Sequence, residues 1–110
     1  MIDQSKQIKR MFWYVFAGMR GGPTRIRIVS LILERPYNMN QIGKDLGLDY
    51  KTVQHHIKVL LENRVINSEE KKYGTQYFPS VFLEQHINIF KEIKDKLKEK
   101  TTIQRKETEK

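Results

Sequence analysis

A chain of 110 residues is long enough for one ordinary domain and too short for two well-buried ones. Hydrophobic residues make up 38% of it and charged residues 31%, which is typical of a globular protein, and the absence of cysteine excludes disulfides, thiolate metal sites and thiol redox sensing. The net charge of +8 favours a polyanionic partner, but residues 1–35 carry seven basic and two acidic side chains, whereas residues 36–64 carry four and three.

The apolar runs of the sequence are short. A membrane span needs about 18 consecutive apolar residues, and the longest run here covers only residues 11–18. The sequence that follows it, Arg20 and then Gly-Gly-Pro, is not the small-residue cleavage site of a signal peptide. We therefore expect a cytoplasmic protein that makes no membrane contact.

Two amphipathic helices are predicted at the start of the chain. Apolar residues recur at steps of three and four, which predicts a helix over residues 3–18. A Gly-Gly-Pro break follows, and proline fits the first position of a second helix over residues 23–34. In this second helix we expect Arg25 and Arg27 to lie outside the core.

A short helix, a tight turn and a polar-faced helix follow. Asn38 can cap the short helix, and Gln41 three residues later can hydrogen-bond back to the cap. Gly47 is the residue favoured just past a helix C-terminus, and Asp49 can cap the next helix, which is predicted over residues 50–63. This arrangement is typical of a helix-turn-helix.

The last part of the chain predicts a hairpin and a long helix. Short strands are indicated at residues 65–66 and 75–78, with Gly74 in the turn between them. A helix is predicted over residues 80–98, and the Lys-, Glu- and Thr-rich stretch 99–110 is expected to be a disordered tail.

This order of elements predicts a mostly α (α+β) fold, a winged helix-turn-helix with a two-stranded wing. A helix fits the DNA major groove, which is about 12 Å wide, and Gln54 can pair with adenine through two hydrogen bonds. A polar helix face is usually only solvated, so the joint occurrence of cap, turn, polar face and hairpin carries the prediction of double-stranded DNA as partner. The candidate contacts are polar side chains of the two helices and the hairpin tip: Asn40, Gln41, Tyr50, Lys51, Thr52, Gln54, His55, Lys58, Lys71, Lys72 and Tyr73.

Two segments resemble the ArsR-type (arsenic-repressor-like) winged-helix regulators. Residues 24–29 resemble the TRxxIL segment of that family, and residues 53–66 are similar to its SxHLKxLxxxGLV recognition-helix stretch. The matching His, Leu, Lys and Leu positions are occupied by His56, Ile57, Lys58 and Leu60. Gln54 replaces the family serine and Arg64 stands near its glycine, which implies a different reading of the groove.

The resemblance raises the question of metal sensing and implies where a metal would bind. Sensors of this family use a Cys pair near the recognition helix, or Asp, His and Glu on the last helix. This chain has no cysteine and only His86 on its last helix, and His55 and His56 lie about 100° apart around theirs. We therefore expect no metal and no cofactor, and leave open which effector, if any, is bound.

Catalytic motifs are missing as well. The chain contains neither a Gly-rich phosphate loop followed by Lys-Ser/Thr nor a recognisable Ser, His and Asp arrangement. We therefore expect that the protein is not an enzyme.

The long first and last helices predict a homodimer. Apolar residues form a seam along the last helix, and aromatic residues circle the first, so a second copy is expected to cover both. The alternative is that the two helices pack on each other within one chain. The predicted interface residues are Met11, Phe12, Val15, Phe16, Leu83, Ile87, Phe90, Ile93 and Leu97.

One domain is therefore expected over residues 1–98, with 1–20 and 80–98 as dimerisation helices and 21–79 as the winged core. The favoured function is a sequence-specific regulator, a repressor acting as a homodimer. A sequence-tolerant architectural or chromatin protein is favoured by the basic ends, and a protein-interaction module of the transcription machinery by the nearly neutral centre.

Overall fold

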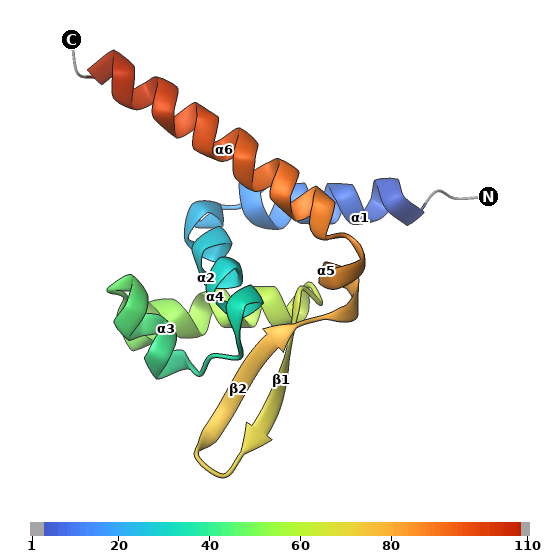
Figure 1. The fold of residues 1–110 in the computed structure, drawn as a ribbon, viewed down its shortest axis with the longest axis vertical. Helices are drawn as coiled ribbons and strands as arrows, with labels where there is room; N and C mark the ends of the chain where they lie inside the picture. The colour runs from blue at the N-terminus through green and yellow to red at the C-terminus, as the bar shows by residue number, and fades with distance from the viewer. Residues whose placement is uncertain (1–3, 109–110) are drawn as a thin grey trace.

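The computed structural model describes the backbone of residues 4–108 and the side chains as far as Lys98. The start of the first predicted helix, residue 3, and the last two tail residues, 109–110, lie outside the described residues. The elements follow one another as α1 (Gln4–Trp13), η1 (Tyr14–Gly18), α2 (Gly22–Glu34), α3 (Met39–Leu46), α4 (Tyr50–Glu62), β1 (Ile66–Lys71), β2 (Gly74–Pro79), α5 (Val81–Gln85) and α6 (Ile87–Thr108) (Figure 1). The predicted fold, mostly α with a two-stranded wing, is confirmed.

The first predicted helix ends in a wider turn than expected. Residues 14–18 form a π-helix, closed by a 2.8 Å hydrogen bond from the Met19 amide to the Tyr14 carbonyl. Single π turns inside helices are uncommon and are frequent at functional sites. The start of α2 packs directly on this turn, since a Cβ at Gly22 would lie 2.0 Å from the Phe16 carbonyl oxygen. Glycine is therefore required for this close approach.

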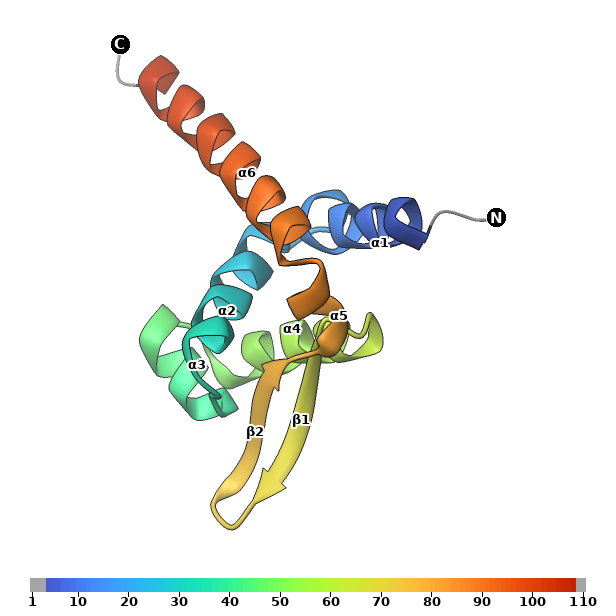
Figure 2. The ribbon, with the colours of Figure 1, turned by 45° about the vertical axis from the view of Figure 1, so that its right-hand side comes forward.

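Aromatic residues of the core hold the N-terminal helices against the C-terminal helix. Phe16 packs edge-on against Phe12 and Phe90, with ring centroids 6.1 and 5.2 Å away. These contacts connect α1 and η1 to α6, whose first turns lie beside α1 (Figures 1 and 2). Edge-to-face packing of this kind adds to the stabilisation that burial provides.

This packing corrects the sequence interpretation of the apolar seams. Six of the nine predicted interface residues are buried within one chain: Phe12, Val15, Phe16, Leu83, Phe90 and Ile93. A second copy is not needed to cover them, because the first and last helices cover each other. Met11, Ile87 and Leu97 remain partly exposed.

The last predicted helix is interrupted at His86. The Ser80 hydroxyl caps the short α5, and the Nδ1 of His86 donates to the Phe82 carbonyl at 2.9 Å where α5 ends. Helix α6 then runs to Thr108, ten residues past its predicted end at Lys98, and projects beyond the body of the molecule (Figure 2). Residues 99–108 contain neither Gly nor Pro and are rich in helix-forming Lys, Glu, Gln and Arg, which accounts for the longer helix. Among residues 4–108, each helix is either too short or too polar to span a lipid bilayer.

The wing is longer than predicted. β1 and β2 pair antiparallel from Ile66–Pro79 at the base to Lys71–Gly74 at the tip. Gly74 at the turn has φ +118°, a conformation that side chains other than glycine rarely adopt. The hairpin extends away from the helices on the side opposite α6 (Figure 1).

Candidate nucleic-acid interface

Local capping sets the geometry of the helix-turn-helix as predicted. The Asn38 side chain accepts from the Gln41 amide at 2.8 Å, and the Gln41 side chain accepts from the Asn38 amide at 3.0 Å. Gly47 ends α3 with φ +67°, a left-handed conformation. The Asp49 carboxylate then accepts from the Thr52 amide at 2.7 Å and so begins α4. Hydrogen bonding to the Thr52 side chain, and then to the Thr52 amide, holds the pKa of Asp49 below its usual range.

The two sides of α4 have opposite character. Val53, Ile57 and Leu60 are buried in the core. The exposed residues of the outer face are Tyr50, Lys51, Gln54, His55 and Lys58. Their side chains supply cations, hydrogen-bond donors and acceptors on an element that matches the width of the major groove.

A cleft of about 260 Å³ connects the helix-turn-helix to the wing. Asn40 from α3, Tyr50 from α4 and Tyr73 from the wing tip all line it, although they are distant in sequence. Burial, together with the neighbouring phenol of Tyr50, raises the pKa of Tyr77 at the base of this cleft. The structure thus brings three predicted contact residues onto one surface.

The other predicted contact residues differ in exposure and in the contacts that they already make. Thr52 is half-buried, and Gln41 is half-buried with its side-chain oxygen held by the cap of α3. On the wing, Lys71 lies 2.9 Å from Glu69, and the Lys72 ammonium lies 5.8 Å from the centre of the Tyr73 ring. These two lysines remain exposed, so their ends can still reach a phosphate.

Arg25 lies inside the core, so the prediction that it lies outside is wrong. Its side chain is fully buried and donates to three acceptors, one of which is His56 on α4. The available signal was spacing, because Arg25 lies four and seven residues before Val29 and Ile32, on the buried stripe of α2. Charge alone led to the opposite assignment, whereas Arg27 is exposed as predicted.

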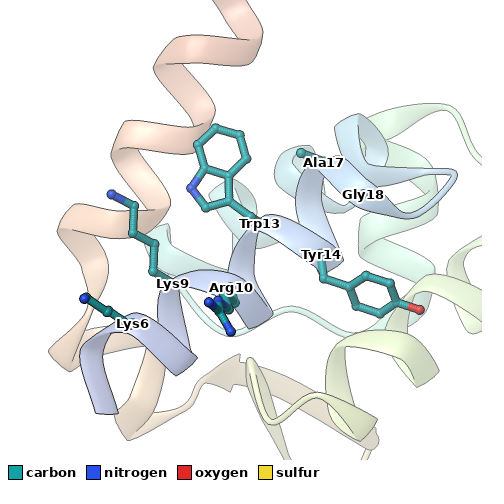
Figure 3. A pocket seen from close by; sticks show the side chains of 7 residues that line it. All are labelled: Lys6, Lys9, Arg10, Trp13, Tyr14, Ala17 and Gly18. Carbon is teal, nitrogen blue, oxygen red and sulfur yellow. The ribbon is translucent and has the colours of Figure 1, made fainter. Parts of the chain in front are cut away.

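A second hollow surface lies on the N-terminal helices. A groove of about 660 Å³ is lined by residues of α1 and η1 alone, and Figure 3 shows them: Lys6, Lys9, Arg10, Trp13, Tyr14, Ala17 and Gly18. Glu92 of α6 lies 3.7 Å from Lys9 and 3.3 Å from Lys96, and these two ammonium groups lower the pKa of its carboxyl. Trp13 extends towards α6, where Lys96 lies 5.6 Å from its ring centre, while Tyr14 points away (Figure 3).

Metal-ligating residues do not gather anywhere in the described part of the chain. No group of three or more His, Asp or Glu side chains there could hold an ion together. His55 and His56 have their ring centres 5.3 Å apart, but His56 is turned into the core.

Part of the chain matches a known protein family. The sequence model described as "Bacterial regulatory protein, arsR family" matches residues 22–68, from the start of α2 into β1. This confirms the resemblance seen in residues 24–29 and 53–66. No curated protein sequence matches the chain.

Solved structures share the fold at low sequence identity. The homodimeric winged helix-turn-helix DNA-binding domain Mb0332 from Mycobacterium bovis, described as a possible ArsR-family transcriptional regulator, is 14% identical, with a TM-score of 0.64 over 90% of this chain and 89% of that one. An ArsR-like transcriptional regulator from Rhodococcus is 10% identical, with a TM-score of 0.63 over 94% and 95%. HlyU from Vibrio cholerae is 13% identical, with a TM-score of 0.63 over 93% and 97%.

Fold and surface together define a winged helix-turn-helix DNA-binding domain. Residues 22–68 match the arsR-family sequence model, and the chain is similar to ArsR-like, DNA-binding transcription regulators. That family consists of regulators rather than of enzymes.

Proposed function

We propose that the protein is a sequence-specific repressor that binds double-stranded DNA as a homodimer. The observation that carries this proposal is that α3, Tyr50 at the start of α4 and the wing tip line one cleft, while the outer face of α4 is polar and exposed. A helix of this kind enters the major groove, and a wing beside it reaches the adjacent backbone or minor groove. Repression is the proposed outcome because a dimer lying across a promoter excludes polymerase without further contacts.

The proposed contacts divide into two groups. Gln54 reads a base, since its amide can donate to and accept from one adenine edge at once. Lys51, Lys58 and the wing lysines bind phosphate, which gives affinity without sequence information. His55 and Tyr50 are exposed beside Gln54 and complete the face that meets the groove. The Gln41 amide nitrogen is left for DNA, since only its oxygen is used by the cap.

The proposed dimer uses apolar surface that one chain leaves uncovered. Met11 and the 42% exposed Phe82 line a groove of about 330 Å³ between α1, the end of α4 and α5. Ile87 of α6 is also partly exposed. The Mycobacterium bovis structure that shares this fold is described as homodimeric, which supports a second copy as the occupant. A two-fold dimer presents two α4 helices to successive turns of a pseudo-palindromic site.

A sequence-tolerant architectural protein is the second candidate. Lys6 and Arg10 line the α1 groove and are exposed. Cations placed away from the α4 face would add affinity for any duplex rather than for one sequence.

Selection of bound fragments from random duplex DNA, followed by competition at rising salt, separates the two candidates. A specific regulator should yield one two-part motif and keep its preference as salt rises, because base contacts depend on salt less than phosphate contacts do. An architectural protein should yield no motif and release all duplexes together.

A further inference from the structure

A buried arginine connects the recognition helix to the N-terminal π turn. Arg25 on α2 donates from Nε to the Val15 carbonyl, from Nη2 to the Arg20 carbonyl and from Nη1 to Nδ1 of His56, each at 3.0 Å. Its fork therefore spans η1, the turn after it and the middle of α4. The planar guanidinium suits such a role, because its donors are held in a fixed geometry.

The Arg25–His56 contact depends on the protonation state of the imidazole. A guanidinium can only donate, so Nδ1 of His56 must accept and its ring must be neutral. A proton on Nδ1 would remove the acceptor and place two cations 3.0 Å apart in the core. Burial, with Arg25 and His55 nearby, keeps the pKa of His56 below its usual range, which agrees with a neutral ring near pH 7.

The surroundings of His56 offer no compensation for a second positive charge. The charged or titratable groups that face it are Arg25 from α2 and His55 from its own helix. No carboxylate is recorded against it among residues 4–98. Gly21 lies against the ring, since a Cβ there would lie 2.7 Å from Cε1 of His56. Protonation therefore favours displacement of the ring away from Arg25.

We propose that Arg25 is a positioning residue that fixes α4 relative to η1, and that protonation of His56 releases this link and weakens DNA binding in mildly acidic solution. His56 stands next to His55 and two residues after Gln54 on the same helix. Displacement of His56 therefore moves the DNA-facing side of α4. This regulation rests on the proposed DNA-binding function of α4. Buried histidines whose protonation breaks an interaction are the usual elements of pH-dependent switches.

The test compares native His56 with His56→Asn, whose side-chain oxygen can accept from Arg25 but does not titrate. Both proteins carry His55→Asn and His86→Asn, so that position 56 holds the last imidazole of the chain. Affinity for a selected duplex is measured at pH 7.5 and pH 5.0, with circular dichroism as the check of fold. The native ring should raise Kd about threefold or more at pH 5.0, because a released ring binds a proton at the usual histidine pKa of about 6.5, so that acid favours the released state, and His56→Asn should change Kd by less than about 1.5-fold. Equal pH dependence of the two proteins would overturn the proposal.

A DNA-free readout separates this switch from the proposed function and remains valid if the variant does not fold. In the protein that carries His55→Asn and His86→Asn and keeps His56, amide resonances of η1 and of α4 should titrate together with one midpoint. If they do and no duplex binds at either pH, the DNA-binding proposal fails and the Arg25 link stands. If α4 resonances titrate while those of η1 stay fixed, Arg25 does not connect the two and the inference is wrong.

Discussion

Tyr37 and Tyr77 exchange two backbone hydrogen bonds, 3.2 Å from the Tyr37 amide to the Tyr77 carbonyl and 2.8 Å in the reverse direction. Tyr37 directly precedes the cap of α3, and Tyr77 lies in β2 of the wing. Both side chains are buried. The bridge therefore fixes the base of the wing to the helix-turn-helix, so that the wing and α4 approach a duplex as one unit.

Gln54→Ala should relax sequence preference at one or two base pairs. The amide is the side chain on α4 best suited to a bidentate base contact, and its loss should cost about 1–3 kcal/mol on the selected site. Lys58→Ala is the matched control from the same face, and should weaken selected and random duplexes alike. Anisotropy titrations with both duplexes measure the difference, and an equal loss for Gln54→Ala on the two duplexes would argue against base readout.

Phe82→Glu should give folded monomers. Phe82 is partly exposed in one chain, so a carboxylate there stays solvated in the monomer but is buried unpaired in the proposed dimer. Light scattering should give twice the chain mass for the native protein and the single mass for the variant. Tyr73→Glu is the control, because Tyr73 is exposed at the wing tip and should leave the mass unchanged. A native protein that is monomeric at tens of micromolar would refute the dimer.

Phe90→Glu is unsuitable for that purpose. Phe90 is 1% exposed and packs on Phe16, so its replacement would bury a charge in the core and unfold the chain whether or not it dimerises.

Asn38→Ala should lower the free energy of unfolding by about 1 kcal/mol, because it removes the side-chain acceptor of the α3 capping box. Asn40→Ala is the control two residues later. Asn40 is exposed, and its replacement should change stability by less than about 0.5 kcal/mol. Urea unfolding of both variants gives the comparison, and equal losses would contradict the role of the cap.

The stability of the DNA-free protein should fall on mild acidification. Burial first, then Arg25 and His55, lowers the pKa of His56 below the value of about 6.5 that the unfolded chain has. The unfolded state then binds more protons, so the free energy of unfolding declines as pH drops through about 6.5 towards the folded pKa and is constant above this range. Urea unfolding at pH 7.5 and 5.0 should show a larger loss for the native protein than for His56→Asn. A native protein as stable at pH 5.0 as at pH 7.5 would contradict a buried, neutral His56.

Features that depend on neighbouring residues could be predicted from the sequence. The capping box of Asn38 and Gln41, the left-handed Gly47 and the Asp49 cap each need only a few adjacent residues, and all three are present. The polar face of α4 follows from helical spacing in the same way.

Features that depend on distant segments could not be predicted. Helical spacing indicates that Arg25 lies on the buried stripe of α2, but no local pattern reveals that the carbonyls of Val15 and Arg20 and the ring of His56 converge on it. The apolar seams were assigned to a second copy because sequence spacing does not distinguish intrachain from interchain packing. Phe16 and Phe90 lie 74 positions apart and contact each other within one chain, so the buried part of these seams is covered by intrachain packing.

Competition binding shows whether α4 recognises a DNA sequence. A labelled duplex carrying the selected motif is bound at moderate salt and challenged with the same duplex scrambled, then the series is repeated at higher salt. The protein should prefer the motif by about a thousandfold or more, and this preference should persist as salt rises and shrink when Gln54 is replaced by Ala. Equal competition by motif and scrambled duplexes at every salt concentration would contradict sequence-specific recognition by α4.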